Sequence, residues 1–188
     1  VATIMSAPVR GGKLVSVDPS PAMAVTGVEK VVKFDDAVIV VGKGYWSAIK
    51  GLRALSPSFT DGGHGQLSSA SVFEAQDEAR KAGKAKDEGG DGDVAAAFAS
   101  AGKSVHEADF RLPFLHHAMM EPFALTARHK DGRLDVWGGL QDPLASKMIA
   151  AKAAGLDSDD VTFHPMIMGG GFGRRFPDNC EIIGQVAK

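Results

Sequence analysis

The chain has 188 residues and a formal net charge of −2, and 44% of its residues are hydrophobic. This balance is typical of a globular domain. Charges of both signs leave no basic face for a nucleic-acid backbone, and an aromatic content of 7% is too low for base-stacking platforms. No run approaches the roughly 20 apolar residues of a membrane span. We therefore expect no nucleic-acid partner and no membrane span in this segment.

Cysteine is rare in the chain and glycine is abundant. The single cysteine, Cys180, excludes an internal disulfide and a cysteine-rich metal cage. The 23 glycines are about 12% of the residues, where about 7% is usual. This excess indicates loops with a specific role.

Residues 1–62 are predicted to form a compact α/β unit. Stretches 13–18 and 28–34 alternate apolar and polar residues, as half-buried strands do, and the apolar run AVIVVG at 37–42 predicts a central strand. Apolar residues then recur at three- and four-residue steps, which predicts an amphipathic helix that Pro57 ends.

Residues 63–102 are predicted to be a linker with helices. The stretch 68–83 has the composition of a surface helix, and the segment after it is charged and rich in glycine. The sequence DVAAAFASAG then predicts a short helix that Gly102 closes.

Residues 103–188 are predicted to begin a second α/β block. The stretch 104–112 alternates like a strand, and two further strands, FALTARHK and RLDVWGG, are joined as a hairpin by Asp131-Gly132, a common tight-turn dipeptide.

The next predicted elements are a capped helix and a strand. Asp142 supplies an N-cap acceptor just before Pro143, and the helix is expected to run to Gly155. The strand VTFHPMIM at 161–168 leads directly into the sequence GGGFGRR, which is the sharpest feature of the chain.

The GGGFGRR segment combines four glycines, Phe172 and two arginines. Glycines let backbone N–H groups approach a ligand, and arginines donate in pairs to phosphate. Neither nucleotide fingerprint fits, because the Rossmann pattern needs glycine at Arg174 and the P-loop pattern needs lysine followed by Ser or Thr. Two interpretations stay open: a loop that binds a phosphate-bearing ligand, and a glycine-rich turn with two exposed arginines.

The segment LHHAMMEP is a second candidate. On a helix, His117 and Glu121 would share one face and present two metal ligands, but Pro113 and Pro122 argue against a settled helix and no third ligand is evident. The alternative is a buried histidine satisfied by backbone beside a structural glutamate. We therefore predict no metal site made of protein ligands.

Gln141 is a third candidate because it ends a predicted strand just before a helix. Its side chain either makes a hydrogen bond within the loop or binds a ligand. No G-x-S-x-G pattern is present, so serine-hydrolase chemistry is not indicated.

Taken in order, the segments from PFLHHAMMEP to GGGFGRR resemble the large subunit of the molybdenum hydroxylases, the xanthine dehydrogenase and aldehyde oxidoreductase family. HAMMEP and the arginine pair are most similar to the isoquinoline 1-oxidoreductase beta-subunit branch. PVRGGKLVSVD and the block from GVEKVVKF to GLRAL resemble the α/β hammerhead domain of that family. The resemblance implies an α+β fold, with a hammerhead-like domain at 1–62 and the first part of a molybdopterin-binding α/β domain at 103–188.

The resemblance also implies cofactor contacts. A molybdopterin-type molybdenum cofactor, in its cytosine dinucleotide form, is expected to lie against the glycine loop. The candidate cofactor-binding residues are Gly170, Gly171, Phe172, Gly173, Arg174 and Gln141. Phe176 stands where xanthine-oxidising members keep a substrate-binding glutamate, which argues against purine oxidation.

The reaction implied is hydroxylation of an N-heteroaromatic or aldehyde carbon with water as the oxygen source. Electrons would leave through 2Fe-2S clusters on a small iron–sulfur partner subunit. The general-base glutamate of this family is expected beyond Lys188, so no catalytic residue is assigned here and the fragment alone is expected to be inactive. The alternative is a non-enzymatic phosphate- or nucleotide-binding or assembly module that uses the GGGFGRR loop. Cytoplasmic and periplasmic localisation both remain open.

Overall fold

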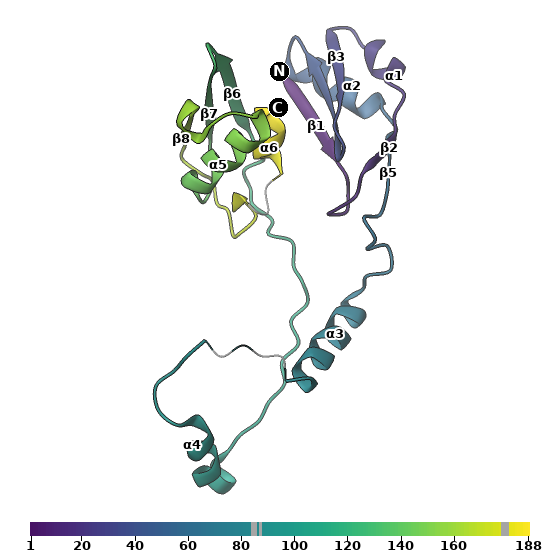
Figure 1. Ribbon diagram of the computed structural model, residues 1–188. Helices are drawn as coiled ribbons and strands as arrows, with labels where there is room; N and C mark the ends of the chain where they lie inside the picture. The colour runs from purple at the N-terminus through teal and green to yellow at the C-terminus, as the bar shows by residue number, and fades with distance from the viewer. Residues whose placement is uncertain (84–85, 87, 178–180) are drawn as a thin grey trace. The chain divides into compact units, whose positions relative to one another are not determined.

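The structure is a computed structural model that describes residues 1–83, 86, 88–177 and 181–188, so Cys180 lies outside the described residues. The chain divides into two compact units, Val1–Leu112 and Pro113–Lys188. Both contain helices and strands, which confirms the α+β class (Figure 1). The finer division into 1–62, 63–102 and 103–188 stays a prediction.

The first unit is built on an antiparallel sheet of β1 (Ala2–Ser6), β4 (Ala37–Gly42) and β3 (Val28–Lys33). The apolar run forms β4, which lies in the middle and confirms the predicted central strand. The edge strand β1 had no clear signal in the sequence. The remaining short elements are α1 (Ser20–Met23) and the pair β2 (Leu14–Ser16) and β5 (Ser58–Phe59).

The predicted amphipathic helix is α2 (Tyr45–Ala54), and it packs on this sheet. Gly51 allows a close approach, because a Cβ there would lie 2.7 Å from Val28 Cγ2 and 2.9 Å from Val40 Cγ1. Val38 and Val40 of β4 share one buried cluster with Leu52 of α2 and Leu55 just after it, so this unit has its own apolar core.

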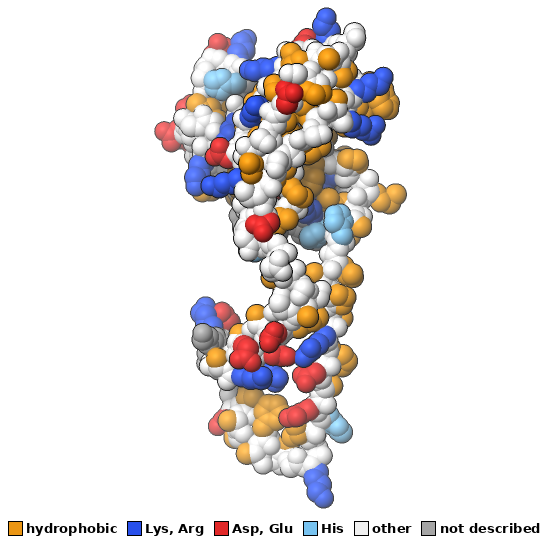
Figure 2. Space-filling view, turned by 90° about the vertical axis from the view of Figure 1, so that its right-hand side faces the viewer, with side chains coloured by type: hydrophobic (Ala, Val, Ile, Leu, Met, Phe, Trp, Pro, Cys, Tyr) orange, Lys and Arg blue, Asp and Glu red, His pale blue; other side chains and the backbone are white. Residues whose placement is uncertain are grey.

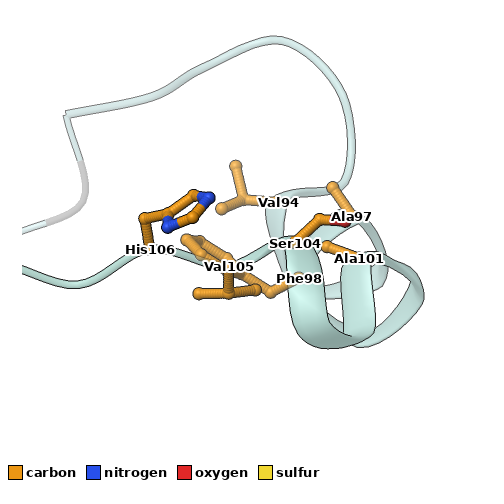
Figure 3. Close-up of a pocket in the computed structure, with 7 residues that line it drawn as sticks. All are labelled: Val94, Ala97, Phe98, Ala101, Ser104, Val105 and His106. Carbon is orange, nitrogen blue, oxygen red and sulfur yellow. The ribbon is translucent and has the colours of Figure 1, made fainter.

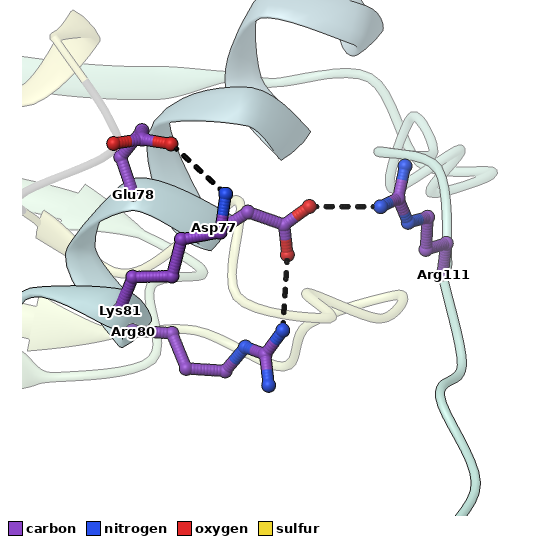
Figure 4. A network of polar contacts seen from close by, with 5 residues as sticks. All are labelled: Asp77, Glu78, Arg80, Lys81 and Arg111. Atoms are coloured by element: carbon purple, nitrogen blue, oxygen red, sulfur yellow. Dashed lines mark hydrogen bonds and ion pairs between the residues drawn. The ribbon is translucent and has the colours of Figure 1, made fainter.

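The predicted linker helices are α3 (Ser69–Lys81) and α4 (Val94–Ala101), followed by η1 (Gly102–Ser104). Neither α3 nor α4 buries a side chain. Asp77 of α3 pairs with Arg111 at 2.8 Å and with Arg80 at 4.0 Å (Figure 4). All three side chains are solvent-accessible, and pairs of this kind contribute about 0–1 kcal/mol each.

The second unit holds β6 (Leu125–Lys130), β7 (Arg133–Gly138) and β8 (Val161–Pro165) in that spatial order. The hairpin between β6 and β7 turns at Asp131 and Gly132, with φ of 52° and 75°, as a primed turn requires. This confirms the predicted hairpin.

Strands β7 and β8 are parallel and are connected through α5 (Pro143–Ala154) and η2 (Ser158–Asp160). Asp142 caps α5 by accepting from the Ala145 N–H at 2.9 Å, and Gly155 ends it in the left-handed region, as predicted. Because β7 and β8 run in the same direction, the segments that follow them leave the sheet at one edge.

The core of this unit lies between the sheet and the helices α5 and α6 (Ile182–Ala187) (Figure 1). Leu134 and Val136 of β7 point into it, whereas Asp135 and Trp137 alternate onto the opposite sheet face.

Two strand predictions were wrong, one entirely and one in its extent. The expected strand at 104–112 is not formed, and residues 105–119 have no regular structure and are largely exposed. Alternation alone does not make a strand when no neighbouring strand accepts its backbone hydrogen bonds. The strand predicted at 161–168 ends at Pro165, where the chain turns into the glycine loop.

The surface agrees with the mixed charge of the sequence. On the face drawn in Figure 2, acidic and basic side chains are interspersed. Within the described residues, no helix is both long enough and apolar enough to cross a bilayer.

Leu134→Ala is expected to destabilise the second unit by about 2–5 kcal/mol, because Leu134 is 2% exposed in the core. Leu144→Ala is the control, since Leu144 is 76% exposed on α5 and should change stability by at most about 0.5 kcal/mol. Urea unfolding followed by Trp137 fluorescence in a Trp46→Phe background measures both. Equal midpoints for the two variants would contradict the assigned core.

Candidate functional site

The glycine loop follows β8 in a conformation that its glycines make possible. Gly170 and Gly173 have φ of 93° and 91°, where side chains with a Cβ are strained. Phe172 adopts φ of 53° and is 72% exposed. A bulky residue in this region costs about 1–3 kcal/mol, and such strain clusters at functional sites.

Two hydrogen bonds from other segments hold the ends of this loop. The Gly169 N–H donates to the Glu121 carboxylate, and the Gly173 N–H donates to Gln141 Oε1 at 3.0 Å. Between these anchors, the N–H groups of Gly170, Gly171 and Phe172 donate to no acceptor among the described residues. Within the described part of the chain, the loop therefore presents three successive backbone donors without an acceptor.

Gln141 lies against the loop from the turn between β7 and α5. A Cβ on the buried Gly171 would overlap Gln141 Oε1, so the close approach requires glycine at this position. The Gln141 N–H also donates to the Arg175 carbonyl at 3.1 Å. The structure thus brings Gln141 to the predicted glycine loop.

The two arginines after the loop have different environments. Arg175 is 1% exposed and donates to the backbone carbonyls of Gly139 and Glu121 at 2.9 and 2.8 Å. Arg174 is 31% exposed at its side chain and pairs with Glu181 at 3.3 Å. Both guanidinium groups lie over the Phe123 ring, with the guanidinium carbon 4.9 Å from the ring centroid for Arg175 and 5.4 Å for Arg174. The interpretation as a turn with two exposed arginines is therefore wrong.

The histidine segment forms neither the predicted helix nor a buried histidine, whereas Glu121 is structural, as the second interpretation held. Residues 105–119 contain no helix, and His117 is exposed rather than buried. A Cβ on Gly173 would lie 3.8 Å from His117 Nε2, so the imidazole borders the glycine loop. In the described part of the chain, no three His, Cys, Asp or Glu side chains converge as a metal site.

The structural role of Glu121 was one of the two interpretations, but its partners were not predicted from the sequence. Its carboxylate anchors Gly169 and also lies 3.0 Å from the Arg175 guanidinium. These partners are 48 and 54 residues away in the sequence. No local pattern signals contacts at such separations, although GGGFGRR and MMEP were both recognised as unusual.

A groove in the first unit is a weaker candidate site. It is lined by Val94, Ala97, Phe98, Ala101, Ser104, Val105 and His106 (Figure 3). Its lining is almost wholly apolar, with His106 as the one titratable side chain. It therefore lacks the convergent polar groups that fix the orientation of a small ligand.

A polar cluster covers the sheet face opposite the helices of the second unit. Asp135 accepts from His164 Nε2 at 2.8 Å and from Arg128 at 2.8 Å. The His164 ring stacks on Trp137 with centroids 4.7 Å apart. These hydrogen bonds hold the pKa of Asp135 below its usual value. The bond from His164 has the largest effect and the bond from Arg128 the next largest, while desolvation acts in the opposite direction.

His164→Ala is expected to raise the pKa of Asp135 toward the usual value of about 3.9. Because the pKa of Asp135 is lower in the folded than in the unfolded state, its carboxylate stabilises the folded state fully at pH values above the unfolded pKa. This stabilisation is lost as the pH falls through the folded pKa. Carboxyl carbon NMR titration measures the shift. Thr162→Ala, on the same strand, is the control. An unchanged Asp135 pKa in His164→Ala would contradict the assigned hydrogen bond.

Two curated proteins are similar to the chain in sequence. The beta subunit of isoquinoline 1-oxidoreductase from Brevundimonas diminuta is 30% identical over 201 residues, covering 100% of the chain and 26% of that protein. A membrane-bound aldehyde dehydrogenase [pyrroloquinoline-quinone] from Gluconacetobacter polyoxogenes is 28% identical over 188 residues, covering 94% and 24%. The chain therefore spans about a quarter of the length of these relatives.

Solved structures that share the fold include a Cu,Mo-CO dehydrogenase and a quinoline 2-oxidoreductase. The Cu,Mo-CO dehydrogenase matches with a TM-score of 0.59 and 18% identity, over 93% of the chain and 28% of its own. Quinoline 2-oxidoreductase from Pseudomonas putida 86 matches with a TM-score of 0.58 and 16% identity, over 100% and 30%.

A family model described as molybdopterin cofactor-binding domain matches residues 74–187. This range covers more than half of the chain and includes Glu121, Gln141 and the whole glycine loop. The chain therefore belongs to the family of molybdopterin cofactor-binding domains.

Proposed function

We propose that this chain is part of a molybdenum-cofactor oxidoreductase and that its glycine loop contacts the cofactor. The observation that carries the proposal is the set of free N–H groups at Gly170, Gly171 and Phe172, held between two anchored ends. A molybdopterin-type cofactor would present oxygen atoms that accept hydrogen bonds from such donors. Membership of the cofactor-binding family supports the same ligand.

The other candidate residues have roles that fit this ligand. Gln141 fixes the loop from the side of Gly171 and leaves its own amide N–H₂ group available as a donor. Arg174 is partly exposed and can exchange its contact with Glu181 for a cofactor phosphate. Gly173, with φ of 91°, lets the chain turn away directly after the donors.

The proposed reaction is hydroxylation of an N-heteroaromatic or aldehyde carbon. When bound, a molybdenum cofactor supplies the transfer of a water-derived oxygen atom to carbon and accepts two electrons. The names of isoquinoline 1-oxidoreductase and quinoline 2-oxidoreductase support a nitrogen-ring substrate, and that of the aldehyde dehydrogenase supports the aldehyde alternative. The cytosine dinucleotide form of the cofactor and a small 2Fe-2S partner subunit follow from the family resemblance.

We expect the 188-residue chain by itself to show no turnover. Its relatives are about four times longer, and a site built from several segments is incomplete when only some of them are present. Isoquinoline or benzaldehyde oxidation with a dye acceptor measures this. The positive control is the complete gene product that carries residues 1–188, produced together with an iron–sulfur subunit, and it should show turnover. Turnover by the short chain would contradict the proposal.

Gly171→Ala is expected to lower the molybdenum and releasable pterin content of the complete gene product by at least about tenfold, because the added Cβ displaces Gln141 from the loop. Metal analysis and pterin fluorescence measure this. Gly90→Ala is the control, since a Cβ there meets nothing within 4 Å. An unchanged cofactor content in Gly171→Ala would contradict the proposed role of the loop in cofactor binding.

A further inference from the structure

The structure assigns to the Glu121–Arg175 ion pair the task of positioning the glycine loop. In this assignment Arg175 acts on the loop from inside the protein and does not bind the phosphate of a ligand. The inference rests on the proposed function only for the identity of that ligand. The contacts that carry it belong to the chain itself.

Arg175 is the largest fully buried side chain among the described residues. Its Nη1 donates to the Gly139 carbonyl at 2.9 Å, and its Nη2 donates to the Glu121 carbonyl at 2.8 Å and lies 3.4 Å from the Pro122 carbonyl. One guanidinium group therefore joins the segment before β6, the segment after β7 and the end of the glycine loop. An arginine bound on this many sides is not available to an external phosphate.

The Glu121 carboxylate extends this connection to the other end of the loop. Its Oε2 lies 3.0 Å from Arg175 Nη2 and also accepts the Gly169 N–H. A Cβ at Gly169 would lie 2.8 Å from that of Glu121, so this approach requires glycine. The Glu121–Arg175 ion pair thus holds the chain on both sides of the loop. Gly169 comes directly before the three free donors, and Arg175 comes two residues after Gly173.

The guanidinium shape matters as well as its charge. Lysine carries one compact ammonium group, which cannot reach carbonyls on two sides and a carboxylate at the same time. Arg175 Nε is buried without a partner among the described residues, so the side chain already bears a desolvation cost. The contacts of Arg175 that order the loop offset this desolvation cost.

Arg174 provides the internal contrast. Arg174 directly precedes Arg175, but its side chain is 31% exposed. Its ionic contact is with Glu181, on the C-terminal side of the loop. The neighbouring arginines therefore divide their tasks: Arg174 is the ligand candidate and Arg175 is the positioning residue.

The test compares backbone order in the isolated chain by ¹⁵N relaxation. Wild-type Gly169 and Gly173 are expected to have order parameters near about 0.85, and both Arg175→Lys and Glu121→Gln are expected to reduce them below about 0.6. Residues of β7 should keep their values, because the core of the second unit is unchanged. The Gly170 and Gly171 amide signals should shift in both variants.

Two further variants separate positioning from general stability. The double variant Glu121→Gln/Arg175→Lys should be no more disordered than the worse single variant, because the two residues act as one unit. Arg133→Lys is the matched control, since Arg133 is exposed on the same unit and its contact to the Asp159 carbonyl is 3.5 Å long. It should leave the loop signals at wild-type positions.

The inference is overturned if Glu121→Gln keeps wild-type order at Gly169, or if the two single effects are independent. Glu121→Gln keeps Arg175 and side-chain volume, so it decides the question even where Arg175→Lys does not fold. In the complete gene product, both variants should lower molybdenum content by at least about tenfold. A wild-type protein without molybdenum would contradict the proposed function, while the relaxation result would still test the ion pair.

Discussion

The second unit depends on one buried cation. Arg175 lies inside the protein, where its charge is paired with Glu121 and its Nη1 and Nη2 groups donate to the carbonyls of Gly139 and Glu121. A buried charge without such partners is strongly unfavourable, so these contacts must form together. The segment before β6, the turn after β7 and the glycine loop are consequently held as one structure around the guanidinium group.

The parallel arrangement of β7 and β8 makes this possible. Gly139 follows β7, the glycine loop follows β8, and both leave the sheet at the same edge. The loop itself is irregular and contains a strained Phe172, which is tolerated because Glu121 and Gln141 hold its two ends. The fold thereby converts a flexible glycine sequence into an ordered row of backbone donors.

Local chemistry made much of this predictable from the sequence. The Asp131-Gly132 turn, the Asp142 cap and the apolar run of β4 act on their own neighbours, and all three were placed correctly. The stretch at 104–112 was misassigned because strand formation depends on a partner strand, which alternation does not reveal.

The candidate site shows the same limit. The glycine loop and Gln141 were identified, because both interrupt regular structure at strand ends. The opposite environments of Arg174 and Arg175 were not, since the partners of Arg175 lie 36 to 54 residues earlier in the chain. Long-range contacts of this kind follow from sheet topology, and residue spacing alone does not encode them.

The most direct test of the account is a high-resolution experimental structure of the complete, cofactor-loaded protein. We predict that the backbone nitrogens of Gly170, Gly171 and Phe172 lie within hydrogen-bonding distance of cofactor oxygen atoms, with Arg175 still buried against Glu121. A cofactor bound elsewhere, with these three N–H groups facing solvent, would contradict the central claim.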